Sequence, residues 1–213
     1  MIEIRRYESK VLSSNMYVVV EGDRAIVIDP SDDVEPAEGL HVECILLTHE
    51  HYDHISGVNL WKEETNAPVV CSSACAASIR DPKKNLARYF SVFCELQTWV
   101  KADTIPEYDP GYRCEADETF TDRKEFGWLG HRWLLFELPG HSPGSIGILL
   151  DGTALFSGDS LIKDCKTNFG APGGSRKQWE TTSVPRLKNL SKDIRVYPGH
   201  FGDFIYETNE LLY

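Results

Sequence analysis

The chain has 213 residues, of which 41% are hydrophobic and 11% aromatic, enough apolar material for one substantial core. Its 22 Lys and Arg residues against 33 Asp and Glu residues give a net charge of −11, which argues against nucleic acid as a partner because phosphate backbones would be repelled. The N-terminus opens on alternating charge rather than an apolar run, so we expect a cytoplasmic protein with neither a signal peptide nor a membrane span.

The N-terminal part of the chain predicts β-strands, one of which ends directly in a histidine-rich sequence. An almost continuous apolar run over residues 42–47 is typical of a strand covered on both faces, and it leads into residues 48–54, THEHYDH. A roughly helical pattern begins at about His54, which places residues 48–54 in a strand-to-helix loop where ligands can converge. The strands predicted here are residues 2–7, 16–20 and 24–28, which form an antiparallel meander, followed by 42–47 and 68–71.

Residues 72–115 are expected to form a helical and loop insertion beside the candidate site, within a single domain that covers residues 1–213. From residue 118 the apolar pattern returns to a period of two, which predicts a second sheet. The strands predicted there are residues 119–121, 126–129, 132–138, 145–150, 154–156 and 194–197. The predicted helices of the chain are residues 73–79, 85–96, 178–190 and 202–213.

Residues 48–54 hold three of the seven histidines of the chain beside an aspartate, a density typical of metal ligands. His49 and His51 are separated by one residue, and two imidazoles at that spacing in an extended loop can point at the same metal ion. The candidate third ligand is His141, which lies in a Gly/Pro turn after a predicted strand. These three residues predict a three-histidine site with open coordination.

A second metal site can begin at Asp53 and His54, which face differently from the two preceding histidines. His200 follows the last predicted strand and would complete this site, while Asp159 could bridge the two ions. Two ions held ~3.5–4 Å apart can share a hydroxide and polarise a carbonyl or phosphoryl oxygen. Taken singly, a histidine in such a turn is more often an ordinary surface or core residue, but five of the seven histidines share this strand-end context.

Residues outside this pattern keep simpler explanations. His41 and His131 are interpreted as ordinary histidines. Asp29 ends a predicted strand, where it would either cap a turn or support a metal site from beneath, and the local sequence favours the turn. Cys165 follows Asp159 closely but is interpreted, like the other five cysteines, as a reduced structural residue, since the cysteines lack C-x-x-C spacing.

Residues 49–54 match the H-x-H-x-D-H motif of the metallo-β-lactamase superfamily at every fixed position, and the chain resembles this family along its length. Asp29, His141, Asp159 and His200 fall in the order and local context that the family shows. The resemblance implies an α/β fold, an αββα sandwich of two mixed β-sheets flanked by helices, with the metal ions between loops at one edge. It also shifts Asp29 toward the supporting role beneath the metals.

Within that superfamily the chain is most similar to the glyoxalase II-like (hydroxyacylglutathione hydrolase-like) group of thioester hydrolases. The similarity rests on residues 139–145, PGHSPGS, and residues 81–85, DPKKN. The chain departs from the group at residues 166–168, KTN, and at residues 201–203, FGD. Only 13 residues follow His200, too few for the helical extension with which that group grips glutathione, so glutathione recognition is not expected.

The ligand pattern and the resemblance together predict a dinuclear metal-dependent hydrolase of a small thioester or related ester. A hydroxide that bridges two divalent ions would attack the acyl carbonyl, and Asp53 would orient it or accept a proton. We expect zinc, with iron or manganese as alternatives. Lys166 and Asn168 are candidate substrate-binding residues. The expected partner is a small-molecule substrate, and a homodimer is kept open.

Three other functions remain as alternatives to this hydrolase. A mononuclear iron persulfide dioxygenase would use the three-histidine site alone. A lactamase or lactonase would hydrolyse a different bond at the same centre, and a non-enzymatic metal sensor would bind without turnover. The metal content and the uptake of oxygen separate the dioxygenase from the hydrolase.

Overall fold

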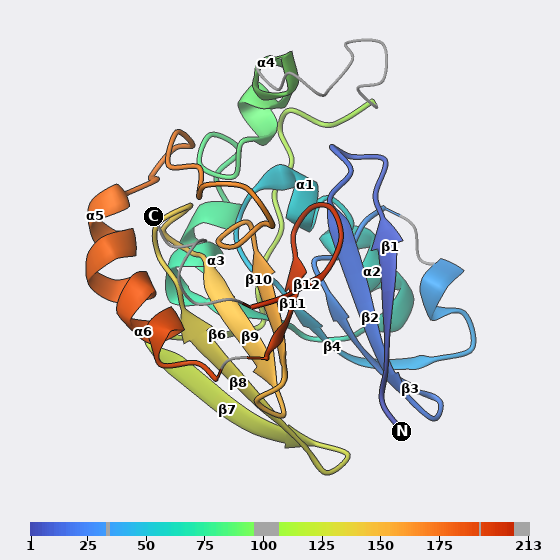
Figure 1. Cartoon of the computed structure of the whole chain (residues 1–213). Helices are drawn as coiled ribbons and strands as arrows, with labels where there is room; N and C mark the ends of the chain where they lie inside the picture. The colour runs from blue at the N-terminus through green and yellow to red at the C-terminus, as the bar shows by residue number, and fades with distance from the viewer. Residues whose placement is uncertain (33–34, 96–106, 192, 207–213) are drawn as a thin grey trace.

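The computed structural model describes residues 1–32, 35–95, 107–191 and 193–206, and in it two six-stranded sheets lie face to face (Figure 1). The first sheet has the order β1-β2-β3-β4-β5-β6, with β1 (Glu3–Glu8), β2 (Asn15–Glu21), β3 (Arg24–Ile28), β4 (His41–Leu46), β5 (Val69–Ser72) and β6 (Glu118–Phe120). The second sheet has the order β12-β11-β10-β9-β8-β7, with β7 (Arg123–Trp128), β8 (His131–Glu137), β9 (Ile146–Leu150), β10 (Ala154–Gly158), β11 (Arg195–Pro198) and β12 (Phe204–Ile205).

Both sheets are mixed. In the first sheet β1, β2 and β3 pair antiparallel, whereas β3 to β6 pair parallel. In the second sheet β7 to β10 pair antiparallel, β10 and β11 pair parallel, and β12 returns antiparallel to β11. Because β3, β4 and β5 run parallel to one another, their carboxyl ends lie at the same edge of the sheet.

Helices cover the outer face of each sheet. On the first sheet lie α1 (Tyr52–Ile55), α2 (Val58–Thr65) and α3 (Ser73–Ile79), and on the second a continuous helical run made of α5 (Arg176–Gln178), the π-helical η4 (Trp179–Ser183) and α6 (Val184–Lys188). The described residues also form η1 (Glu35–Ala37), η2 (Ala87–Tyr89) and α4 (Phe90–Glu95). The expected sandwich of two mixed sheets flanked by helices is confirmed.

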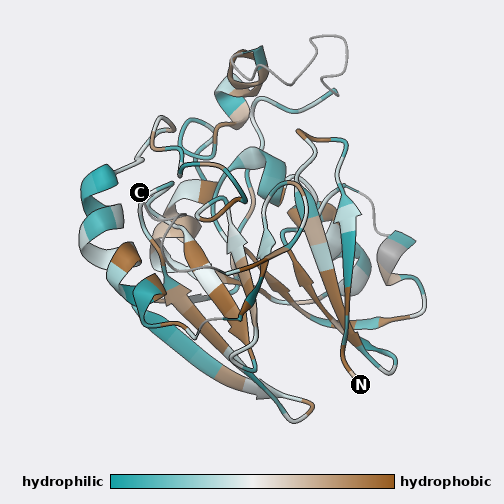
Figure 2. Cartoon of the chain, in the orientation of Figure 1, coloured by the Kyte–Doolittle hydropathy of each residue, from teal (hydrophilic) through white to brown (hydrophobic). Residues whose placement is uncertain are grey.

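Alternating side chains of the strands fill three apolar layers. Along β2, Val18 packs toward the helices of the first sheet, while Tyr17 and Val19 point between the sheets, where they join Trp133. Trp179 anchors the third layer beneath the helical run. Figure 2 shows hydrophobic colour on most strands of both sheets, whereas β7 at the edge of the second sheet is largely hydrophilic. A charged edge strand resists pairing with other chains.

Two predicted elements differ from the structure. The strand predicted at residues 119–121 was expected in the second sheet, but the corresponding β6 belongs to the first, because Asp117 N donates to Val69 O and Val69 N donates to the Asp117 carboxylate, both at 2.8 Å. The helix predicted over residues 202–213 is wrong at its start, where Phe204–Ile205 is strand β12. Residues 207–213 lie outside the described residues.

The expected insertion over residues 72–115 contains α3, η2 and α4, with residues 96–106 outside the described part. Its definition as an insertion stays a prediction. Among the helices that the structure describes, none is both long and apolar enough to cross a membrane.

Candidate metal centre

Strand ends deliver every candidate ligand to one edge of the sandwich. His49 and His51 follow β4 in an extended loop, and Asp53 and His54 sit on the short helix α1 that continues it. In the second sheet, the turn after β8, the end of β10 and the end of β11 supply the other three, which are His141, Asp159 and His200. The six histidine and aspartate ligands other than Asp159 are at most 5% exposed, and the Asp159 side chain is 14% exposed.

The ligand atoms form two adjacent groups. The first ligand group consists of His49, His51 and His141, and the second of Asp53, His54 and His200; within each, one ligand atom per residue lies within 4.8 Å of the others. In the first group His141 Nε2 is 3.0 Å from His51 Nδ1. In the second, Asp53 Oδ2 is 3.4 Å from His54 Nε2 and 3.3 Å from His200 Nε2.

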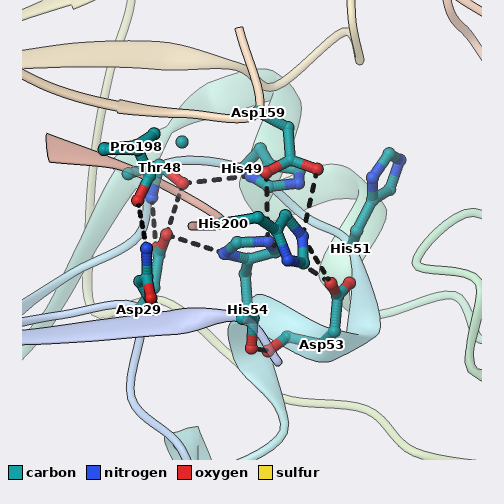
Figure 3. Close-up of polar contacts among 12 residues, drawn as sticks. Asp29, Thr48, His49, His51, Asp53, His54, Asp159, Pro198 and His200 are labelled. Carbon is teal, nitrogen blue, oxygen red and sulfur yellow. Dashed lines mark hydrogen bonds and ion pairs between the residues drawn. The ribbon is translucent and has the colours of Figure 1, made fainter. Parts of the chain in front are cut away.

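Asp159 lies between the two groups (Figure 3). Its Oδ2 is 3.6 Å from His141 Nε2 and 3.5 Å from His200 Nε2, and its Oδ1 is 3.4 Å from His54 Nε2. One carboxylate therefore faces both groups, which is the geometry required of a bridging ligand.

Asp29 supports the centre from the end of β3. Its Oδ1 accepts a hydrogen bond from Thr48 N at 2.7 Å, and its Oδ2 accepts one from Thr48 Oγ1 at 2.5 Å and from His54 Nδ1 at 3.0 Å (Figure 3). Thr48 Oγ1 in turn contacts His49 Nδ1 at 3.0 Å. Asp29 thus orients one histidine of each group, with Nε2 of both rings left to act as a ligand. Thr48 was not singled out in the sequence, although it directly precedes the motif.

Charge differs between the two groups. Burial, together with neighbouring imidazoles, lowers the pKa of His51 to about 3, and burial lowers the pKa of His49 and His141, so these rings are neutral. In the second group burial opposes the charged form, but Asp159 and Asp53 outweigh it and raise the pKa of His200 to about 10. The carboxylates of the second group therefore favour a positive charge beside them, and a metal ion bound there would replace the proton on His200.

The residues present fit metal ions. Nε2 of His49, His51 and His54 is buried and has no hydrogen-bond partner among the described atoms. An unpaired buried polar atom is unfavourable, so these ring nitrogens, which belong to both ligand groups, indicate a partner other than protein. Imidazole nitrogens and carboxylate oxygens are the ligands that zinc, iron and manganese share. The first ligand group would hold one ion, the second another, and Asp159 would contact both.

Glycines allow the strand ends to approach this closely. A Cβ at Gly199 would overlap the Asp159 carboxylate and lie 2.7 Å from His54 Cε1. A Cβ at Gly158 would lie 2.5 Å from Thr48 Oγ1, and its φ of +49° also favours glycine. Both glycines precede a candidate ligand, so they let β10 and β11 bring those ligands against the loop after β4.

Glu50, between the two histidines of the motif, is a buried residue that the sequence did not single out. Its carboxylate accepts hydrogen bonds from Ser142 Oγ at 2.8 Å and from Gly144 N at 3.4 Å. Burial raises the pKa of Glu50. The side chain ties the loop after β4 to the turn that carries His141, and the only sequence signal for it is a charged residue inside an otherwise buried motif.

A cavity of about 180 Å³ opens beside the ligands. The predicted substrate-binding residues Lys166 and Asn168 both line it, and so does Cys165, which is exposed rather than buried as a structural cysteine would be. The backbone carbonyl of Asn168 accepts a hydrogen bond from His141 Nδ1 at 2.9 Å, while its side chain accepts one from Gly170 N. Asn168 therefore orients the candidate ligand His141 through its main chain. The other lining residues are apolar or are candidate ligands, apart from Thr167.

Comparisons with known proteins agree with this arrangement. The family model described as "Metallo-beta-lactamase superfamily" matches residues 9–200. The chain is similar to a hydroxyacylglutathione hydrolase of Prochlorococcus marinus, with 28% identity over 89% of this chain and 66% of that protein, so it spans slightly less than two thirds of that relative's length. It is also similar to a probable polyketide biosynthesis zinc-dependent hydrolase of Bacillus velezensis, with 26% identity over 94% of this chain and 79% of that one.

A solved structure shows the same fold. The structure of the B3 metallo-beta-lactamase BLEG-1 superposes on this chain with a TM-score of 0.77. The superposition covers 95% of this chain and 94% of the BLEG-1 chain. The sequence identity is 24%, so this likeness extends to the fold alone.

Proposed function

The chain belongs to the metallo-β-lactamase superfamily, and from this premise we infer that it is a metal-dependent hydrolase whose substrate is a small thioester or related ester. The observation that carries the inference is the pair of buried ligand groups joined by Asp159 at the wall of a cavity. Similarity to hydroxyacylglutathione hydrolases supports the thioester. Because this chain covers 66% of such a relative, the glutathione moiety is not carried over.

Bound metal ions would supply Lewis-acid polarisation of the acyl carbonyl and activation of water. The protein's own residues would do the rest. Asp53 lines the cavity, and although burial opposes its charge, His54 and His200 hold its pKa well below the ordinary value. It is therefore a carboxylate at neutral pH, able to orient water or accept its proton. Asp29 and the Asn168 carbonyl fix the rings of the histidines.

We propose two divalent ions, with zinc as the first choice and iron or manganese as alternatives. The second ligand group and its link through Asp159 support two ions over the single iron of a persulfide dioxygenase. The zinc dependence stated for the relative from Bacillus velezensis supports zinc. Imidazole and carboxylate ligands alone do not select among these metals.

Metal analysis and a substrate panel test this function. Purified protein should contain about two metal equivalents and should hydrolyse acyl thioesters of N-acetylcysteamine, with loss of turnover in chelator and recovery on adding zinc. The His141→Ala variant should lose turnover, while His41→Ala, at an exposed histidine on β4, should keep it. Nitrocefin and a homoserine lactone probe the lactamase and lactonase alternatives. One equivalent of iron with oxygen uptake on a persulfide, or no metal-dependent thioester turnover, would refute the proposal.

A further inference from the structure

Two large apolar residues line the cavity in an unfavourable backbone conformation. Leu12 has a φ of +57° and Phe201 a φ of +64°, the left-handed region that residues with a Cβ rarely adopt. Leu12 is 8% exposed, whereas Phe201 is 51% exposed and follows His200 directly. Such conformations persist when the surrounding structure enforces them, and they gather at sites where a side chain must be presented to a ligand.

Hydrogen bonds enforce both conformations. The turn that presents Leu12 is closed by a bond from Ser9 N to Ser14 O at 2.8 Å, and Ser14 Oγ donates to Asp53 O at 2.6 Å. The carbonyl of Phe201 accepts hydrogen bonds from Arg6 Nη1 at 2.6 Å and from Asn15 Nδ2 at 2.8 Å. We call Leu12 and Phe201 together the apolar wall of the cavity. Its backbone is hydrogen-bonded to, or continuous with, the backbone of the candidate ligands Asp53 and His200.

Another part of the cavity lining is mainly polar and carries a positive charge. It consists of Ile162 and residues 165–168, where Thr167 Oγ1 donates to Ser160 O at 3.0 Å and the carbonyl of Asn168 accepts from His141 Nδ1. Lys166 is the only lysine or arginine among the cavity-lining residues that the structure describes, and no ion pair joins it to any of the described residues. In a chain with a net charge of −11, an unneutralised lysine in the cavity is suited to an anionic group of a substrate.

We propose that the substrate is a thioester with an apolar acyl chain, which packs against Leu12 and Phe201, and with an anionic group on the thiol side, which Lys166 attracts. The proposal rests on the proposed function and narrows it. A glutathione thioester of a small hydroxy acid presents a polar acyl group to this wall, so the apolar wall favours a different substrate class. The anion is a carboxylate or a phosphate, which share the charge that Lys166 recognises.

A chain-length series tests the apolar wall. With acetyl, butanoyl and hexanoyl thioesters of N-acetylcysteamine, kcat/KM should rise roughly fourfold for each methylene that the wall covers. Phe201→Ala should lower the hexanoyl-to-acetyl ratio of kcat/KM about tenfold, and Phe201→Leu should restore most of it. Leu129→Ala is the matched control, because Leu129 is 40% exposed with a φ of +50° but lies in the turn between β7 and β8, outside the cavity.

Charged thiols test Lys166. S-hexanoyl mercaptopropionate carries a carboxylate, S-hexanoyl phosphopantetheine a phosphate, and S-hexanoyl N-acetylcysteamine neither. Lys166→Gln should raise KM about threefold for the charged substrate that the site takes, with kcat nearly unchanged and no effect on the neutral one. Lys163→Gln, three residues away and outside the cavity lining, should leave all KM values unchanged. The charged probe with the lower wild-type KM identifies the anion.

The outcomes separate this inference from the proposed function. Thioester turnover with equal kcat/KM for all acyl lengths, or a Phe201→Ala effect independent of length, refutes the apolar wall while leaving a thioester hydrolase. Equal loss on neutral and charged thiols in Lys166→Gln refutes the anionic group. No turnover of any thioester by the zinc-loaded protein refutes the function and the inference together.

Discussion

Replacing Asp29 by Asn isolates the support that this carboxylate gives to the metal centre. Asp29 is 4% exposed and has a φ of +51°, a conformation that Asn adopts about as readily as Asp, so the backbone should not change. The amide oxygen can still accept from Thr48 N. The amide NH₂ group, however, replaces the oxygen that accepts from Thr48 Oγ1 and His54 Nδ1.

The magnitude follows from those two lost bonds. A buried group left without a partner costs about 1–3 kcal/mol, and the hydroxyl of Thr48 can partly adapt by rotating. We therefore expect the metal-free Asp29→Asn variant to lose about 2–4 kcal/mol of unfolding free energy. Removing the carboxylate behind a metal-binding histidine should also weaken metal affinity about 10–100-fold.

Urea unfolding of the metal-free protein measures the first effect, and competition with a chelating indicator measures the second. Asp32→Asn serves as the control, because Asp32 is an exposed acidic residue three positions further along the chain. Both quantities should stay at the wild-type level in that variant. Wild-type metal affinity in Asp29→Asn would refute the idea that Asp29 orients the ligands.

Four further effects are expected. Chelation should lower the melting temperature and zinc should restore it, since a ligand at 100 times its Kd adds about 2.7 kcal/mol to stability; identical curves would contradict a bound metal. Gly199→Ala should reduce the metal content from about two to about one equivalent, while Gly202→Ala, where a Cβ meets nothing within 4 Å, should not. Glu50→Ala should lose about 1–3 kcal/mol in urea unfolding, because Gly144 N loses its acceptor and Ser142 Oγ keeps only Ser145 Oγ as a partner, and Glu50→Gln should lose less; equal losses would argue against these bonds. The hydrogen bond to Asp151 raises the pKa of His131, so its stabilisation of about 0–1 kcal/mol should be present below pH 6.5 and lost as pH rises through the folded pKa. His131→Gln should therefore show a smaller stability deficit at pH 9 than at pH 5.5 in urea titrations, and a constant deficit would refute this.

The order of elements could be predicted from the sequence because periodicity of two and burial on both faces mark most strands directly. The pairing of a short strand could not. Residues 118–120 show the alternation of a strand, but the partner is chosen by the Asp117 carboxylate and Val69, which are 48 residues apart. The strand at Phe204–Ile205 could not be predicted either, since two residues of alternating burial are too few to distinguish a strand from a helix.

The seven candidate ligands could be located because four of them stand together in the H-x-H-x-D-H motif that follows β4, and the other three each follow a glycine at or just after the end of a strand. Their shared convergence in the structure is an observation; their role as ligands stays a prediction. The apolar wall could not be predicted from the sequence, because no local signal indicates that the backbone of Leu12 or Phe201 is in the left-handed conformation. The hydrogen bond from His141 to the Asn168 carbonyl could not be predicted either, since every residue has a backbone carbonyl and only the fold decides which one lies next to His141.

The candidate ligands come from both sheets, and the two sheets are synthesised one after the other. A bound pair of metal ions would therefore link the earlier sheet to the later one. A chain completed only to residue 150 already carries the first ligand group, but it lacks Asp159 and His200. The complete set of seven candidate ligands can therefore assemble only after β10 and β11, which carry Asp159 and His200 at their ends, have packed into the second sheet. An ion in the second ligand group would therefore stabilise the finished sandwich, and loss of that ion would weaken the contact between the two sheets first.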